Sequence, residues 1–364
     1  IDKVRGVLSV AEEELAIEAS AEIPEELPQD EFERRSKKIL SKMDEMGISK
    51  GKQRRLIEKT ASESKSKLDE YDRHLETLGE RNSYSKTDPD ATFMRMKEDA
   101  MNNGQTKPGY NVQISTENQY ITNYGIFRHP NDQGTLIPYL DSFVQRYGMQ
   151  SMDIVADSGY GSEMNYEYLF ANGMTPYVKY NMFHAEMKRM YKDNPFLPGN
   201  MYYNKEQDYY VCPMGQHLDF IYYKKEKSDL GYISTKSVYM AKDCSRCPLR
   251  GMCYKGKTGR RIIEVNHKNN AYRAKARELL TSEKGLEHRS RRPIEPESVF
   301  GNIKFNHGFK RFRLKSAEKV SVEWGLVAIA HNLRKYIARK TENSNSQRLF
   351  SANIGAYLEC CRAA

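Results

Sequence analysis

The sequence lacks the features of a membrane or secreted protein. No stretch approaches the roughly 18 consecutive apolar residues that a membrane span needs, and the longest apolar run is Trp324 to Ala330. The N-terminal residues, Ile1 to Arg5, do not form the apolar core of a secretory signal. We therefore expect a cytoplasmic protein without a membrane partner, whose six cysteines are reduced. An initiator methionine is also absent, which suggests a fragment that lacks an upstream domain.

Positively charged residues only modestly outnumber negatively charged ones. Lys and Arg number 58 against 49 Asp and Glu, which gives a formal net charge of +9. This excess favours an anionic partner such as nucleic acid, but a solvated surface of mixed charge explains it equally well. With 364 residues and 38% hydrophobic content, the chain is long enough to bury a full core, and about two domains with appendages are expected.

Changes in composition divide the chain into five segments. Residues 1–83 are rich in charge and poor in aromatics, and they predict a helical arm and linker. In 84–184, short alternating runs and amphipathic segments predict the first part of an α/β core. The Cys- and Tyr-rich segment 185–270 has no helical period and predicts a mostly β insertion. The helical period returns in 271–340, which complete the core, and 341–364 form a tail.

Two apolar stripes at helical spacing lie at opposite ends of the chain. In the arm, the stripe is expected to lean on whatever follows it, and near the C-terminus it is expected to close the core. The arm stripe consists of Leu68, Tyr71, Leu75 and Leu78, and the C-terminal stripe consists of Val322, Leu326, Ile329 and Leu333.

The first half of the core begins with a predicted β-hairpin. Apolar residues alternate with polar ones from Tyr110 to Ile114, a turn is expected at Glu117 and Asn118, and Tyr120 to Phe127 predicts the return strand. A helix follows, for which Asn131 is the expected cap. Its apolar face carries Leu136, Leu140, Phe143 and Tyr147.

A strand, a turn and a helix are predicted next. The apolar run Met152 to Ala156 ends on Asp157, residues 163–170 are amphipathic, and 175–180 predict a further strand. Ligand sites in open α/β sheets gather at the carboxyl ends of strands, where Gly159 allows a sharp turn. Asp157 is therefore a candidate metal ligand, although a capping aspartate in an ordinary turn is an equally good interpretation.

Two further carboxylate positions are candidates. The pair Asp88 and Asp90 enters the sheet, and Glu297 follows two prolines that suit the start of a helix. Lys304 is expected about two turns, roughly 10 Å, further along the same face. Divalent cations that catalyse phosphodiester cleavage need carboxylate ligands. The simpler explanation of Glu297 is a first-turn glutamate that the helix dipole favours.

At these residues the chain resembles the DDE transposases of bacterial insertion sequences. The resemblance runs from about Tyr84 to Tyr336 and covers most of the chain. Its five pieces follow the order of the family: Thr87-Asp88-Pro89-Asp90-Ala91, Gly109-Tyr110-Asn111-Val112-Gln113, Val155-Ala156-Asp157-Ser158-Gly159-Tyr160-Gly161-Ser162, Glu297-Ser298-Val299-Phe300-Gly301-Asn302-Ile303-Lys304 and His331-Asn332-Leu333.

The resemblance implies a fold and a chemistry. The fold is a ribonuclease H-like mixed sheet with flanking helices, interrupted by the insertion. Asp88, Asp157 and Glu297 would hold two Mg²⁺ ions, for which Mn²⁺ substitutes, and Lys304 would contact a phosphate. Such an enzyme frees the 3′ ends of its element and joins them to target DNA. The implied partners are the terminal inverted repeats, the target duplex and a second subunit assembled on DNA, in the bacterial cytoplasm.

The chain departs from the family pattern near the glutamate. Related transposases carry an arginine four residues before it, where this chain has Pro293, with Arg291 and Arg292 just upstream. Those two arginines are the candidates for the phosphate contact. Glu295 is an alternative to Glu297, but the spacing of Glu297 to Lys304 favours the latter.

The first carboxylate has two candidates. Pro89 is unable to donate a hydrogen bond in a central sheet. Either the strand bends there and Asp88 is the ligand, which we prefer, or the ligand is Asp90.

The cysteines of the insertion have two interpretations. Cys212, Cys244, Cys247 and Cys253 are enough for a tetrahedral Zn²⁺ site, with His217 as a substitute ligand. Reduced cysteines packed inside the insertion are the equal alternative.

Tyrosine and basic side chains suggest DNA contacts. The tyrosines of the insertion predict the faces of a small sheet more strongly than stacking on bases. They are Tyr202, Tyr203, Tyr209, Tyr210, Tyr222 and Tyr223. A basic run follows Glu297, and we interpret it as a phosphate-binding patch. It consists of Lys310, Arg311, Arg313 and Lys315.

Competing functions share these features. A truncated or domesticated transposase remnant would bind DNA without catalysis, and a ribonuclease H-like nuclease would hydrolyse DNA without joining ends.

Overall fold

The computed structural model describes residues 29–47, 50–95, 104–256 and 258–362, and it leaves out the side chains of 29–33, of 342–362 and of a few positions in the arm. The chain divides into two compact units, Ile1–Pro89 and Asp90–Ala364. The predicted linker around Pro24 and Pro28 lies outside the described residues. None of the described helices is long and apolar enough to cross a membrane.

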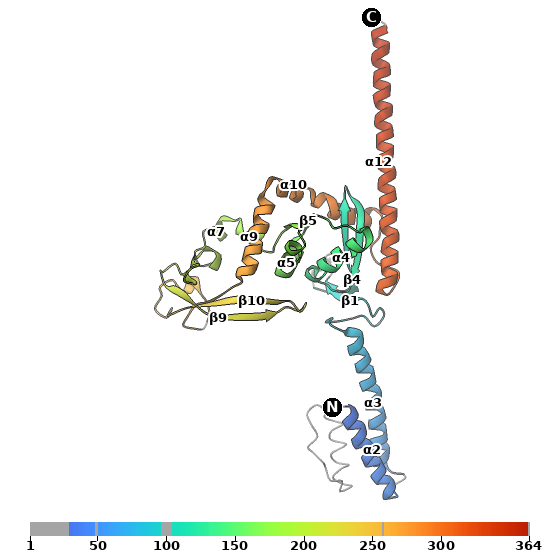
Figure 1. Cartoon of the computed structure of the whole chain (residues 1–364). Coiled ribbons are helices and arrows are strands. Elements are labelled where there is room, and N and C mark those ends of the chain that lie inside the picture. The colour runs from blue at the N-terminus through green and yellow to red at the C-terminus, as the bar shows by residue number, and fades with distance from the viewer. Residues whose placement is uncertain (1–28, 48–49, 96–103, 257, 363–364) are drawn as a thin grey trace. The chain divides into compact units, whose positions relative to one another are not determined.

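The first unit contains two consecutive helices that run in opposite directions, α2 (Gln29–Glu45) and α3 (Lys52–Leu78) (Figure 1). They pack on each other, and Ile39, Met43 and Ile57 are buried. Further along α3, Tyr71 and Leu75 are exposed. The described part of the arm is therefore helical, and among its described side chains only a few apolar ones are buried.

In the second unit, the predicted hairpin is confirmed. Strands β3 (Asn111–Glu117) and β4 (Tyr120–Phe127) pair antiparallel, with a bulge after Ser115. The turn, expected at Glu117 and Asn118, lies one residue further along and consists of Asn118 and Gln119, both with positive φ. This two-residue turn matches the twist of the strands it joins. A shorter ladder precedes it, between β1 (Thr92–Arg95) and β2 (Thr106–Gly109).

The predicted strand, turn, helix and strand are also confirmed. Strand β5 (Asp153–Ala156) runs parallel to β6 (Thr175–Val178), and helix α5 (Glu163–Ala171) connects them. Helices α4 (Leu136–Tyr147) and α9 (His267–Thr281) contribute to the same core (Figure 1). Parallel strands need such a crossover helix, and the apolar faces of strand and helix bury each other. The fold is thus mixed α/β.

The prediction that Asn131 caps helix α4 is wrong. Asn131 makes no side-chain cap hydrogen bond, because a 3₁₀ turn, η1 (Asp132–Gly134), separates it from α4. Leu136 and Leu140 are buried as expected, whereas Tyr147 is exposed at the helix end.

The insertion is a five-stranded antiparallel sheet in the order β11-β10-β9-β8-β7. Its apolar side chains, including Leu218 and Tyr239, form a core of their own. The segment also contains the short helices α6 (Phe183–Glu186), α7 (Arg189–Lys192) and α8 (Arg250–Cys253). The strands are β7 (Tyr202–Asn204), β8 (Tyr209–Val211), β9 (His217–Lys227), β10 (Ile233–Ala241) and β11 (Ile262–Val265).

The expected start of the Glu297 helix is wrong. The helical backbone begins at Ser282 with α10 (Glu283–Arg291) and continues through the prolines as a π-helical turn, η4 (Pro293–Glu297). The short α11 (Ser298–Gly301) and a second π-helical turn, η5 (Asn302–Asn306), complete it. Wide π turns accommodate a proline that an α-helix would not. The expected end is confirmed, since Gly308 has a positive φ.

Helix α12 (Ala317–Arg362) closes a further core with β3, β4 and α11. The face that packs there consists of Val320, Trp324 and Ala328, at a spacing of four residues. The predicted stripe of Val322, Leu326, Ile329 and Leu333 is more than half exposed at every position, so its assignment to the core is wrong. The helix carries apolar side chains on two faces, and the more aromatic one is inside.

Candidate active site

Asp157 lies directly after the parallel strand β5. Its Oδ1 accepts a hydrogen bond of 2.8 Å from the backbone nitrogen of Ser158, which caps the 3₁₀ turn η2 (Ser158–Tyr160). Its other oxygen, Oδ2, lies 3.4 Å from Nη2 of Arg292. The capping interpretation and the site interpretation therefore apply to different oxygens of one carboxylate.

Glu297 meets the same arginine from the other side. Its Oε1 lies 2.6 Å from Nη1 of Arg292. The two residues are five apart, and they bracket the π-helical turn η4. Residues five apart share a face in a π helix, because its hydrogen bonds join each residue to the fifth along the chain. The backbone distortion at the prolines thus brings the arginine to the glutamate.

One guanidinium therefore joins two of the expected triad residues. The side chain of Arg292 is 16% exposed, whereas those of Asp157 and Glu297 are about half exposed. Asp157 and Glu297 are 140 positions apart in the sequence, and both contact the largely buried guanidinium of Arg292. Two carboxylates around a positive group form an anionic site at the end of β5, which is the place where α/β sheets bind ligands.

A third carboxylate, Asp132, lies close to this loop and was not predicted. Its Oδ1 accepts hydrogen bonds from Asn111 at 2.9 Å and from Gln113 at 3.0 Å. The Tyr160 hydroxyl donates to the side-chain oxygen of Gln113. Burial raises the pKa of Tyr160, and the charge of Asp132 adds to that shift. The signal was available: Asn111 and Gln113 put two amides on one face of a strand.

Glycines allow the loop after Asp157 to approach its neighbours. A Cβ on Gly161 would lie 2.2 Å from the carbonyl oxygen of Lys179, just beyond β6. A Cβ on Gly159 would lie 2.9 Å from Oδ2 of Asp132. Contacts under 3 Å are repulsive, so a side chain at either position would displace the loop that carries Asp157.

The two candidates for the first carboxylate lie in different units. Asp90 belongs to the second unit, where Oδ1 pairs with Arg128 at 2.6 Å and Oδ2 accepts from the backbone nitrogen of Ala317 at 2.8 Å. Asp88 belongs to the first unit, is buried, and forms an isolated bridge with Ser85. Pro89 lies outside every strand, so its missing donor disrupts no ladder.

The side chain of Glu295 holds the β3–β4 hairpin, whereas that of Glu297 pairs with Arg292. Its Oε2 accepts a 2.8 Å hydrogen bond from the backbone nitrogen of Gln119, in the hairpin turn. Helix α12 holds the same hairpin, since His331 contacts the carbonyl of Gln119 at 3.0 Å. Asn332 bonds both the nitrogen and the carbonyl of Ile121, at 2.8 and 2.9 Å. The His331-Asn332 motif thus positions the β3–β4 hairpin against the Glu297 helix.

The predicted basic residues differ in their surroundings. Arg291 is exposed and pairs with Glu287 at 3.0 Å, unlike its neighbour Arg292. Lys304 is exposed in η5. The loop after the helix forms an open cavity of about 740 Å³ whose lining includes Lys310, Arg311 and Arg313. The carboxylate of Glu323 anchors this loop, accepting from the backbone nitrogens of Arg313 and Leu314.

The cysteines of the insertion lie among packed side chains. Cys212 and Cys244 contact its apolar core, and Sγ of Cys253 lies 2.6 Å from Nη1 of Arg261. Within the described residues, no group of three or more His, Cys, Asp or Glu side chains is arranged to hold a metal. The contacts support the packed alternative, and the zinc site stays a prediction. Of the tyrosines, Tyr210 is buried, whereas Tyr202 and Tyr223 are exposed.

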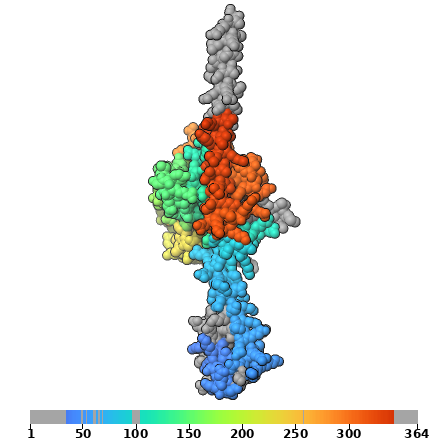
Figure 2. Space-filling view, turned by 90° about the vertical axis from the view of Figure 1, so that its right-hand side faces the viewer, coloured from blue at the N-terminus to red at the C-terminus, as the bar shows by residue number. Residues whose placement is uncertain are grey.

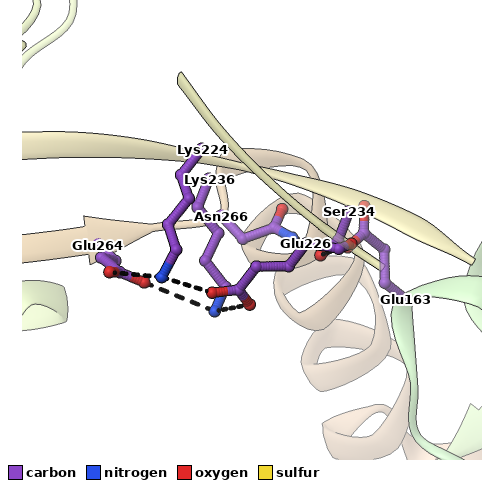
Figure 3. A network of polar contacts seen from close by, with 7 residues as sticks. All are labelled: Glu163, Lys224, Glu226, Ser234, Lys236, Glu264 and Asn266. Carbon is purple, nitrogen blue, oxygen red and sulfur yellow. Dashed lines mark hydrogen bonds and ion pairs between the residues drawn. The ribbon is translucent and has the colours of Figure 1, made fainter. Parts of the chain in front are cut away.

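Polar contacts join the insertion to the helix that follows Asp157. Asn266 donates to Glu163 at 2.6 Å, and the hydroxyl of Tyr232 donates to Glu167 at 2.6 Å. Figure 3 shows Glu163 and Asn266 together with a separate network of lysines and glutamates on the sheet. Leu230, in the β9–β10 turn, lies so close to Gly134 that a Cβ there would be 2.8 Å from its Cδ2. The insertion therefore reaches the elements around the candidate site.

Comparison with protein families supports the resemblance. Residues 211–337 match the family described as "Transposase DDE domain". The matched segment includes most of the insertion, Arg292, Glu297 and Lys304, and it ends on α12. Searches of curated proteins and of solved structures found no match. The resemblance to DDE transposases is thus confirmed over this segment, and Asp157 lies outside it.

Proposed function

We propose that this chain, with its transposase DDE domain segment, is the catalytic part of a transposase that cuts DNA at the 3′ ends of an insertion sequence and joins those ends to target DNA. The observation that carries the proposal is the meeting of Asp157 and Glu297 on the Arg292 guanidinium. The two carboxylates come from distant segments and lie on either side of a guanidinium at the end of a strand. Such a site is suited to phosphodiester chemistry.

The proposed core is ribonuclease H-like. An antiparallel hairpin, a parallel pair with its crossover helix, and helices packed on both support a mixed sheet of that kind. The described ladders β1–β2, β3–β4 and β5–β6 are separate two-stranded pairs, so the joining of β3–β4 and β5–β6 into one sheet is part of the proposal. The strand end that carries Asp157 is the edge where catalytic residues of such a sheet would gather.

We propose that these carboxylates bind a hard divalent cation; within the described residues, no group of three or more His, Cys, Asp or Glu side chains is arranged to hold one. Asp157 and Glu297 supply carboxylate oxygens, which Mg²⁺ and Mn²⁺ prefer, and Arg292 already places a positive group between them. We propose Asp88 as the third ligand, as the resemblance to DDE transposases implies, with Asp90 as the alternative. Two such cations activate an attacking oxygen and stabilise the leaving oxygen of a phosphodiester.

The remaining residues bind and orient the DNA backbone. Asp157 and Glu297 would hold the cation, and the Arg292 guanidinium would donate two hydrogen bonds to a phosphate group of the DNA. Lys304, Arg291 and the basic loop would hold the flanking phosphates. That loop carries Lys310, Arg311 and Arg313.

The proposed partners are DNA duplexes, namely the terminal inverted repeats and the target. Bringing two ends together requires two active sites, so a homodimer assembled on DNA is proposed, acting in the bacterial cytoplasm. The insertion would lie near the DNA, since its β9–β10 turn contacts Gly134 and its tyrosines Tyr202 and Tyr223 are exposed. A structural zinc in the insertion would be a separate, non-catalytic site.

The test is DNA cleavage and joining. Protein with any upstream domain restored is incubated with an element-end duplex, a labelled target duplex and Mg²⁺ or Mn²⁺. We expect nicking at the 3′ end followed by covalent joining, both lost in Asp157→Asn and Glu297→Gln. Nicking without joining would indicate a hydrolytic nuclease, and binding without either would indicate a noncatalytic remnant.

Matched controls separate catalysis from folding. Asp153→Asn changes a carboxylate at the start of the same strand, where it pairs with Lys284 at 2.6 Å. Glu287→Gln changes an exposed carboxylate on the preceding helix. Both controls should retain cleavage. Equal activity in controls and site variants would refute the assignment of Asp157 and Glu297.

A further inference from the structure

Helix α12 carries apolar side chains on two opposite faces. The inner face, with Val320, Trp324 and Ala328, packs on the β3–β4 hairpin and the Glu297 helix. Two residues along from Val320, a rotation of about 200° in an α-helix, the outer face begins at Val322. An amphipathic surface helix has one apolar face, and a helix that is apolar all round is ordinarily covered all round.

The outer stripe is long and regular. Every member is more than half exposed, and Figure 2 shows helix α12, in red, on the surface of the molecule. We call this set the outer stripe: Val322, Leu326, Ile329, Leu333, Tyr336 and Ile337. Together these side chains expose on the order of several hundred Å² of apolar surface. That is comparable to the largest patches on soluble proteins, which are often functional, and approaches the ~800 Å² that one partner contributes to a standard interface.

The spacing of the stripe selects the kind of partner. From Val322 to Tyr336 the intervals are four, three, four and three residues. This is the heptad spacing of a two-helix seam, in which side chains of one helix fill the gaps between those of another helix with the same repeat. A flat sheet or a nucleic acid has no surface of that period. The stripe therefore fits a second helix.

Charges at the two ends of the stripe differ in sign. Glu318 lies four residues before Val322 on the side of the outer stripe, whereas Lys340 lies four residues after Tyr336 on the same side. A parallel pair of such helices would place the basic ends together. An antiparallel pair places each basic end beside the acidic end of its partner, which is electrostatically favourable.

We propose that the outer stripe of α12 is a self-association surface, on which the α12 helix of a second copy of this chain packs antiparallel. The arrangement has twofold symmetry, so each copy contributes the same patch. The pairing lies on the far side of α12 from the hairpin that His331 and Asn332 hold. It does not depend on DNA, on a metal or on the proposed catalytic activity.

The test is the oligomeric state of the full chain without DNA and without divalent metal. Sedimentation equilibrium is measured for the unchanged protein and for the double variant Leu326→Glu and Leu333→Glu. We expect a dimer for the unchanged protein. In the double variant the dissociation constant should rise by roughly a hundredfold or more, because charges would be buried in the seam. Both substituted side chains are exposed, so thermal unfolding of the two proteins should agree at concentrations at which both are monomeric.

The matched control is Leu75→Glu on helix α3. Leu75 and Leu326 are both 64% exposed, and Leu75 belongs to the arm stripe. The control should leave the dimer intact. A dimer that Leu75→Glu dissociates and the α12 double variant does not would overturn the proposal in favour of the arm.

Orientation is tested by charge reversal. Glu318→Lys should weaken an antiparallel dimer by placing a lysine beside Arg339 and Lys340 of the other copy, and adding Arg339→Glu should restore it. Failure of the second change to restore the dimer would refute the antiparallel arrangement. A chain that is monomeric at every concentration would refute self-association. In that case, a lower thermal stability of the double variant would show that another part of the same chain covers the stripe.

Discussion

Arg292 and Glu297 lie five residues apart, and Nη1 of the arginine is 2.6 Å from Oε1 of the glutamate. In an α-helix, residues four apart are neighbours, which suits the family pattern of an arginine four residues before the glutamate. Here Pro293 occupies that position, and the π-helical turn η4 adds one residue to the spacing. Arg292 therefore reaches Glu297 although the sequence interval differs. A local distortion of the backbone compensates for an apparent departure of the sequence.

The first prediction is that Arg292 competes with a metal ion for the carboxylates of Asp157 and Glu297. In Arg292→Gln, the positive group between Asp157 and Glu297 is lost and the two carboxylates attract a divalent cation more strongly. We expect Mn²⁺ to bind the DNA-free protein up to roughly tenfold more tightly, a modest change because both carboxylates are about half exposed. Isothermal titration calorimetry measures it. Arg291→Gln, on the exposed neighbour, should leave the affinity unchanged, and equal effects of both variants would contradict the prediction.

The second prediction concerns the close approach of the Asp157 loop to β6. In Gly161→Ala, the new Cβ would lie 2.2 Å from the Lys179 carbonyl oxygen and 2.8 Å from the Tyr180 Cα, both of them backbone atoms. We expect the free energy of unfolding to fall by about 3 kcal/mol. In Gly159→Ala the contact is with a side-chain atom, Oδ2 of Asp132, and not with backbone, so a loss of about 1 kcal/mol is expected. Urea denaturation compares the two, and an equal loss would count against the backbone clash.

The third prediction concerns the anchor of the hairpin. In Asn332→Ala, the nitrogen and the carbonyl of Ile121 both lose their partner. We expect a decrease of about 2 kcal/mol in the free energy of unfolding, because two half-buried backbone groups become unsatisfied. Asn306→Ala removes a hydrogen bond between exposed side chains and should change stability little. If the two variants were equally stable in chemical denaturation, Asn332 would not be the anchor.

The elements around Asp157 were predictable because their signals are local. Alternation with a period of two marks β3 and β4, and an apolar run followed by small residues marks the end of β5. The partner of Asp157 was not predictable, since Arg292 lies 135 residues away and its position depends on a π turn that no periodicity announces. Asp132 was missed for a related reason: a single aspartate in a 3₁₀ turn has no pattern of its own.

Helix α12 shows a different limit of prediction from hydrophobic spacing. The sequence contains two apolar stripes on this helix, and hydrophobic spacing alone does not say which one faces the domain. The heptad-spaced stripe from Val322 to Leu333 is the more regular, and it was assigned to the core. The structure buries Trp324 and its neighbours instead, because the aromatic side chain fills the space beside Phe300, Phe309 and Phe312.

The fourth prediction concerns the pH dependence of the insertion. Glu226 lies between Lys224, at 2.8 Å, and Lys236, at 2.5 Å, on the exposed face of β9 and β10 (Figure 3). Hydrogen bonds from Lys224 and then Lys236 lower the pKa of Glu226 from 4.5 to about 2. A carboxyl whose pKa is lower in the folded state stabilises that state above its unfolded pKa, and the contribution is lost as the pH falls through the folded value. The network should therefore lose stability between pH 4.5 and 2.

Glu226→Gln tests this, because the glutamine does not titrate. The urea midpoint followed by circular dichroism should fall less steeply on acidification below pH 4.5 in this variant than in the unchanged protein. High salt should reduce the difference, since the network is exposed and screened. Glu206→Gln, in the turn between β7 and β8, changes another exposed carboxyl of the same sheet, and it should retain the original pH profile. Identical profiles for Glu226→Gln and the unchanged protein would show that the lysine pairs do not stabilise the sheet.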